Sequence, residues 1–249
     1  MLYNIIPDIY AYVIILAMIA FSIYYVVNLR KENIPLWHLV LSSLFVIFFA
    51  VLGGRLMWAL EVPDITISEL FLLDLSGFRL LGAVLFVLIA FVIIFFVYKK
   101  LYDININKVL DIQLEGAFLA MAIIKSACFF TGCCYGIETT VPWGMVFQID
   151  ELGLTRHPTQ LYETAALLGI FIILLIIRNK FSTSQKYAIA FILYVVTRMI
   201  IEPFRAEASL FIDGPTRIIY YIMLIVCVLV LFKDKIYGLI QHSKNKDVH

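Results

Sequence analysis

A lysine and three cysteines lie close together at the end of an apolar stretch. Lys125 is followed within ten residues by Cys128, Cys133 and Cys134. A charged side chain at the centre of a bilayer costs about 2.5 to 3.5 kcal/mol on insertion scales, so a buried partner or a functional role must offset that cost. The small residues between 131 and 136 predict that the helix breaks there. Such a break is tolerated at membrane depth where it lines a water-filled cavity or is buried in protein.

A second polar group sits in the later apolar segment Tyr194–Arg205. Arg198 lies four residues after Tyr194 and four before Glu202, so the three share one helix face. An ion pair between Arg198 and Glu202 within the helix is one interpretation. The other is that Arg198 binds a lipid phosphate, because its planar fork matches phosphate oxygens. Arg205 extends the same positive surface outward.

The third polar group is the run RHPTQLYE ahead of the fifth apolar segment. His157 can act as a general base near neutral pH, and the alternative is that it hydrogen-bonds the loop backbone. Gln160 and Glu163 fall at i and i+3 on the helix that follows, where they can orient a partner in the core.

We expect these groups to meet in one polar pocket inside the membrane. Lys125, Arg156 and Arg205 would form an anion-binding chamber reached from the extracytoplasmic side. Arg55 follows a pair of glycines that permits close helix packing. It either snorkels to the interface or joins the pocket.

The cysteine spacing argues against a metal ion. It matches none of the usual C-x-x-C zinc patterns, and two adjacent cysteines seldom ligate one tetrahedral ion without strain. A disulfide, a thiol relay and small-residue packing stay open for Cys128, Cys133 and Cys134, while Cys227 sits alone in an apolar run. We expect no metal and no cofactor.

The composition is that of an all-α integral membrane protein. Hydrophobic residues make up 63% of the chain and charged residues 15%, against roughly 25% charge in soluble domains, and the mean hydropathy is +0.98. A net charge of +1 without a basic run excludes a nucleic-acid partner. The N-terminus lacks the basic region of a signal peptide, so the first apolar segment is expected to be retained.

About seven transmembrane helices are predicted in a single polytopic domain, 1–249. A span needs about 20 mostly apolar residues. The candidate spans lie near 10–28, 38–60, 80–98, 109–131, 161–177, 187–203 and 217–232. Most basic residues of the short connections fall on one side, which predicts an extracytoplasmic N-terminus and a cytoplasmic C-terminus. Residues 64–75 read as an amphipathic interfacial helix.

Together these stretches resemble the bacterial phosphatidylglycerol:prolipoprotein diacylglyceryl transferase family. The similarity rests on GGRL, FxxGCCYG, PWGMVF, RHPTQLYE and YxxxRxxxEPFR, and RHPTQLYE differs from the family's RHPSQLYE at one conservative position. The resemblance implies a seven-span bacterial inner-membrane enzyme. Such an enzyme moves a diacylglyceryl group from a phospholipid donor to the cysteine thiol of a lipoprotein precursor and releases glycerol phosphate.

By matching position, the resemblance implies that Arg198 is the essential sixth-span arginine and Tyr194 its partner. Gly136 closes the signature, and Asp111 matches an aspartate early in the fourth span. The expected catalytic residues are Lys125, His157, Tyr194 and Arg198. The expected substrate-binding residues are Arg55, Cys128, Cys133, Gly136, Arg156, Gln160, Glu163, Glu202 and Arg205.

The chain also departs from the family pattern. The signature GRIGNFINGELYG reads IKSACFFTGCCYG here, so Lys125 replaces an arginine, Cys128 an asparagine and Cys133 a glutamate. The family's HGG entry to the third span reads Leu81-Gly82-Ala83. Two alternatives follow: a relative with another donor or acceptor in which a cysteine takes part covalently, and a non-catalytic membrane protein that binds phospholipid or a partner.

Overall fold

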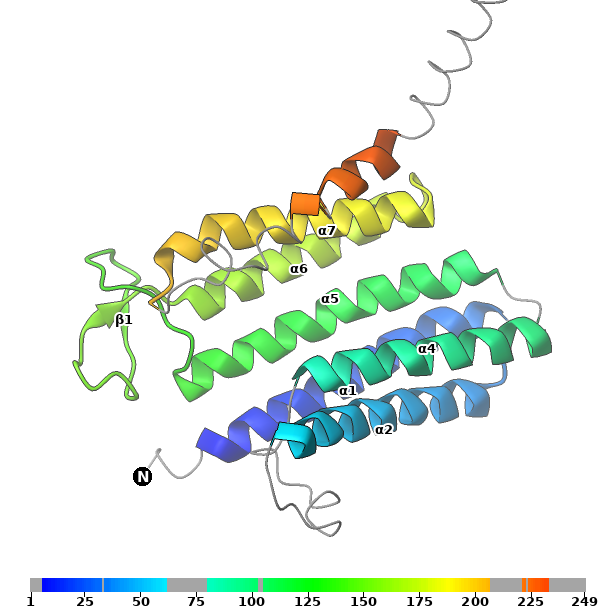
Figure 1. Ribbon diagram of the computed structural model, residues 1–249, viewed down its shortest axis with the longest axis horizontal. Coiled ribbons are helices and arrows are strands. Elements are labelled where there is room, and N and C mark those ends of the chain that lie inside the picture. The colour runs from blue at the N-terminus through cyan, green and yellow to red at the C-terminus, as the bar shows by residue number, and fades with distance from the viewer. Residues whose placement is uncertain are drawn as a thin grey trace, which may run out of the picture. The chain divides into compact units, whose positions relative to one another are not determined.

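The computed structural model describes residues 6–32, 34–61, 80–102, 105–206, 221–222 and 224–232. Within these ranges the chain is mostly helical (Figure 1), and six helices are long and apolar enough to cross a membrane. They are α1 (Ile6–Leu29), α2 (Leu36–Glu61), α4 (Leu80–Tyr102), α5 (Ile106–Thr131), α6 (Thr159–Ile177) and α7 (Thr183–Ile201). These helices match the first six expected spans, and the chain is a multi-pass membrane protein.

Two expected helices lie partly or wholly outside the described residues. The seventh span, 217–232, lies partly outside the described residues, although 221–222 and 224–232 are helical. The total of seven and the position of both termini therefore stay predictions. The interfacial helix expected at 64–75 lies wholly outside the described residues.

The chain divides into two compact units, one within 1–17 and 117–249 and the other within 18–116. Helices α1 and α5 each contribute to both units. The single domain expected from the sequence stays a prediction.

In the unit 18–116, helices α2 and α4 approach each other closely at two glycines. A Cβ atom on Gly53 would lie 2.3 Å from the Gly82 carbonyl oxygen, and one on Gly82 would lie 2.1 Å from the Gly53 carbonyl oxygen. Small residues permit such contacts between membrane helices. The Tyr98 hydroxyl lies 2.8 Å from Ser42 Oγ and adds a polar contact to the apolar core.

In the other unit, α6 and α7 lie side by side as an antiparallel pair (Figure 1). Helix α5 ends where the sequence predicted a break. Gly132 follows it with a φ of 73°, the left-handed conformation that commonly terminates helices. Pro158 precedes α6. Helix α7 begins at a capping box in which Ser182 and Gln185 satisfy each other's backbone N–H groups.

The loop between α5 and α6 is held by backbone hydrogen bonds. Strands β1 (Met145–Val146) and β2 (Thr155–Arg156) pair in antiparallel fashion. The Gly136 N–H donates to the His157 carbonyl, and the Ile137 N–H donates to the Phe204 carbonyl, both at 2.8 Å. The start of this loop is thereby fastened to the entrance of α6 and to the 3-10 turn η4 (Glu202–Phe204) after α7.

Candidate active site

A buried carboxylate in the first turns of α6 binds three cations. Glu163 Oε2 lies 2.6 Å from Lys125 Nζ on α5. Its Oε1 accepts hydrogen bonds from Arg198 Nη1 at 2.5 Å and from Arg205 Nη1 at 2.7 Å. The Glu163 side chain is only 5% exposed. One carboxylate therefore joins three segments that are far apart in the sequence.

Arg198 bridges two carboxylates with its two terminal nitrogens. Nη2 donates to Glu202 Oε2 at 2.8 Å, which confirms the expected pair within the helix, while Nη1 reaches Glu163. Glu202 is buried like Glu163. With Lys125 and Arg205, the cluster holds three cations and two carboxylates. Its formal charge is positive, so it favours a bound anion.

Arg156 differs from the prediction, which placed it in the same chamber as Lys125 and Arg205. Its Nε and Nη2 atoms bind both oxygens of Asp150, at 2.8 and 3.0 Å, and its guanidinium lies 5.3 Å from the centre of the Tyr135 ring. This ion pair with Arg156 lowers the pKa of the Asp150 carboxyl. Arg156 is thus engaged in holding the loop together, because the turn after β1 presents Asp150 to it.

His157 sits in an aromatic environment. Its Nδ1 lies 3.0 Å from the Tyr162 hydroxyl, which also accepts a hydrogen bond from Trp143 Nε1 at 2.7 Å. The His157 ring centre lies 5.1 Å from that of Phe204. Next to it is an apolar cavity of about 250 Å³. The cavity is lined by Tyr162, Ala166, Thr197, Ile200, Ile201 and Phe204.

The first turn of α6 fixes the backbone of the cysteine pair. Gln160 Nε2 donates to the Cys133 carbonyl at 2.6 Å, and the Thr159 hydroxyl donates to the Cys134 carbonyl at 2.7 Å. Both α6 side chains are buried. Gln160, expected to bind substrate, therefore positions the loop that carries the cysteines.

Gly136, also expected to bind substrate, occupies a position with no room for a side chain. A Cβ atom there would lie 2.2 Å from the Phe204 carbonyl oxygen and 2.6 Å from His157 Cβ. The structure gives this glycine a packing role at the point where three segments meet.

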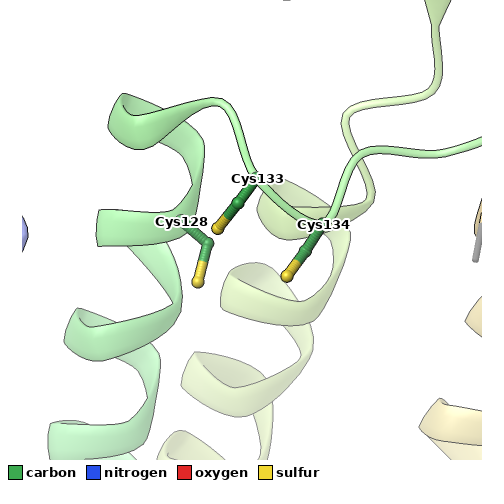
Figure 2. Close-up of side chains that lie close together, drawn as sticks. All are labelled: Cys128, Cys133 and Cys134. Atoms are coloured by element: carbon green, nitrogen blue, oxygen red, sulfur yellow. The ribbon is translucent and has the colours of Figure 1, made fainter. Parts of the chain in front are cut away.

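The three cysteines near the end of α5 converge. Cys128 lies in the last turn of α5 and Cys133 and Cys134 in the loop that follows, and their sulfur atoms lie within 4.8 Å of one another (Figure 2). All four cysteines of the chain, each within the described residues, are free thiols. Neighbouring Cys128 and Cys134, with smaller contributions from the Thr131 hydroxyl and the charge of Lys125, lower the pKa of the Cys133 thiol.

Tyr194 and Arg55 were also expected to belong to the site. Tyr194 is half-buried on α7, one turn before Arg198. Arg55 belongs to the unit 18–116, where it is 5% exposed and its guanidinium carbon lies 4.8 Å from the centre of the Trp58 ring. Arg55 is therefore buried instead of snorkelling, and its part in substrate binding stays a prediction.

Sequence reasoning missed four residues of the site. Thr159 and Tyr162 lie inside the RHPTQLYE run, so that motif held the signal for both. Trp143 lies in the PWGMVF stretch, and its indole donates to the Tyr162 hydroxyl. The local sequence does not identify Asp150, because its ion pair with Arg156 forms across an irregular turn.

Comparison with known proteins finds similarity over nearly the whole chain. The family model described as prolipoprotein diacylglyceryl transferase matches residues 3–233. The chain is 29% identical over 202 residues to a phosphatidylglycerol–prolipoprotein diacylglyceryl transferase of Clostridium tetani, which covers 77% of this chain and 80% of the relative. Proteins of the same name are 37% identical in Clostridioides difficile (52% and 50% covered) and 32% identical in Wolbachia pipientis (75% and 73% covered).

Proposed function

Because the chain belongs to the prolipoprotein diacylglyceryl transferase family, we propose that it transfers a diacylglyceryl group from phosphatidylglycerol to the cysteine thiol of a prolipoprotein. The observation that supports this most is the positive cluster around Glu163, which brings Lys125, Arg198 and Arg205 together within a membrane unit. We place the protein in the bacterial inner membrane, with the site open to the extracytoplasmic leaflet.

The proposed step is a displacement at a glyceryl carbon. The acceptor thiolate forms a carbon–sulfur bond, the carbon–oxygen bond to phosphate breaks, and glycerol phosphate leaves. The phosphate passes from a singly charged diester to a monoester that carries nearly two charges at neutral pH. Cations that contact it therefore stabilise the transition state more than the bound lipid, which is what accelerates a reaction.

Arg198, Lys125 and Arg205 take the role of phosphate clamp, with Tyr194 beside Arg198. His157 is the candidate base. Its Nδ1 lies 3.0 Å from the Tyr162 hydroxyl, and in the tautomer that donates from Nδ1 its Nε2 carries a lone pair for the thiol proton. The apolar cavity shares Tyr162 and Phe204 with the surroundings of His157, so we assign it to the apolar part of the lipid.

Mass spectrometry tests the proposal directly. Purified protein in phosphatidylglycerol nanodiscs is incubated with a peptide that carries the acceptor cysteine, and a gain of one diacylglyceryl unit on that cysteine is expected. A serine peptide and phosphatidylcholine nanodiscs should give none.

Arg198→Ala and Arg198→Lys should each lower transfer by about 10²-fold or more, because neither can bridge two carboxylates and a phosphate. Lys180→Ala, at an exposed position between α6 and α7, is the matched control and should keep full activity. Transfer unaffected by Arg198→Ala would refute the phosphate clamp. Folded wild-type protein that binds the lipid without transferring it would favour the non-catalytic alternative.

A further inference from the structure

The cysteine cluster has the make-up of a soft metal site. Cys128, Cys133 and Cys134 direct their sulfur atoms into one common space between α5 and the loop that follows it (Figure 2). Cys128 is buried, and Cys133 and Cys134 are half-buried, so the two loop cysteines retain some exposure. We propose that these three cysteines bind a Zn²⁺ ion and leave its fourth coordination position open.

The backbone is shaped to bring the adjacent pair together. Two neighbouring side chains ordinarily point apart, which is why the sequence spacing argued against a metal. Cys134 has a φ of 59°, a left-handed conformation that is unfavourable for a residue with a Cβ atom. Hydrogen bonds from Gln160 and Thr159 to the two cysteine carbonyls hold this turn in place. The strained turn lets both loop sulfurs face Cys128.

The distances leave little adjustment to be made. A zinc–sulfur bond of about 2.3 Å in a tetrahedral site separates two sulfurs by roughly 3.8 Å. The three sulfurs here lie within 4.8 Å of one another, so rotamer shifts of about 1 Å close the site. Thiolate sulfur is the ligand that selects Zn²⁺ over hard cations such as Mg²⁺ and Ca²⁺.

The charge also fits. Three thiolates and one Zn²⁺ carry a net single negative charge. Lys125 lies three residues before Cys128 on the same face of α5, so its positive charge partly offsets this negative charge. Three protein ligands with one open position form the usual layout of catalytic zinc sites, in which the fourth ligand is exchangeable.

The open position suits the acceptor thiol, an assignment that rests on the proposed function. When the thiol binds, a zinc–sulfur bond forms, a water ligand leaves, and the thiol proton passes to the proposed base, His157. A metal-bound thiol is deprotonated, and the thiolate is the form that attacks carbon.

Metal retention is the first test. Reduced protein in detergent is loaded with Zn²⁺, desalted and assayed for bound metal, and a single equivalent is expected. Loading with Co²⁺ should give a sulfur-to-cobalt charge-transfer band. The double variant Cys128→Asn, Cys133→Glu, which introduces the family signature's residues, should lose both signals and still fold. Cys227→Ala is the matched control and should keep both.

The second test adds the acceptor peptide to the Co²⁺ protein. Its thiol should shift the ligand-field bands, and a serine peptide should not. Wild-type protein that retains no Zn²⁺, or that retains only Cu(I), overturns the zinc site, whatever its transferase activity. Retained metal without a spectral response overturns the thiol assignment alone. Retained metal with a shifted spectrum but no lipid transfer refutes the proposed function without contradicting the zinc site.

Discussion

At the scale of single residues, the Glu163 carboxylate is the group on which three cations depend. It contacts Lys125, Arg198 and Arg205, whereas Glu202 forms an ion pair only with Arg198 within the described part of the chain. Removing one partner of a buried ion pair is strongly destabilising, because the remaining charges stay desolvated. Glu163 is therefore expected to contribute more to stability than Glu202, although both are buried and both contact Arg198.

Glu163→Gln should lower the stability of the protein by about 3 to 5 kcal/mol, because it leaves three half-buried cations facing one another. Glu202→Gln should cost clearly less, since among the described residues Glu202 forms an ion pair with Arg198 alone. Thermal unfolding of both variants in the same detergent measures the difference. Equal melting temperatures for the two would contradict the central position of Glu163.

At the scale of elements, the segment 135–137 lies between the entrance of α6 and the turn after α7. Its backbone bonds to His157 and Phe204 place Arg205 within reach of Glu163. The same segment continues the cysteine loop. The same backbone hydrogen bonds therefore support both the positive cluster around Glu163 and the cysteine cluster.

Gly136→Ala should disturb both clusters, because the added Cβ would lie 2.2 Å from the Phe204 carbonyl oxygen. We expect a lowered melting temperature and a loss of transfer activity. Gly169→Ala on α6 is the matched control, since a Cβ there meets nothing within 4 Å. It should be neutral or slightly stabilising, because alanine favours helices over glycine. Equal behaviour of the two variants would refute the close contact at Gly136.

The loop around Asp150 should depend on pH. Its pairing with Arg156 lowers the pKa of Asp150 below the ordinary value of about 3.9, so its stabilising contribution is complete above that value. It is lost as the pH falls through the lowered pKa. A nitroxide on Leu152→Cys, an exposed site, should become mobile only below about pH 4.

In the same labelled protein, Asp150→Asn should be mobile at every pH, because the ion pair is gone. If the mobility of the label changes neither with pH nor with this substitution, the Asp150–Arg156 ion pair does not hold the loop.

The sequence predicted the spans better than the site. Hydropathy and Gly132 were enough to predict where α5 ends. The spacing of Arg198 and Glu202 offered their ion pair as one of two interpretations, and the structure shows that pair. The sequence predicted that the three polar groups meet, but spacing along one helix does not show which side chain lies at their centre. The convergence of Lys125 and Arg205 on Glu163 therefore required the folded chain. The cysteine cluster depends on a left-handed φ at Cys134, which no apolar pattern encodes.

At the scale of the whole molecule, the orientation in the membrane stays a prediction from the basic residues. Leu152 lies in the loop between α5 and α6, and Asn179 between α6 and α7. A membrane-impermeant maleimide should label Leu152→Cys in intact cells and Asn179→Cys only after permeabilisation, each compared with the unmodified protein. The reverse pattern would invert the proposed topology.

The Glu163 ion pairs also bear on how tightly the lipid is held. Glu163 pairs with the same three cations that are proposed to bind the phosphate. Under the proposed function, this carboxylate therefore acts as an electrostatic placeholder for phosphate. An entering headgroup competes with it, and the released product is displaced by it. Binding is then an exchange of one anion for another, which weakens ground-state affinity and shortens the residence time of the doubly charged product. A site arranged in this way favours turnover over retention.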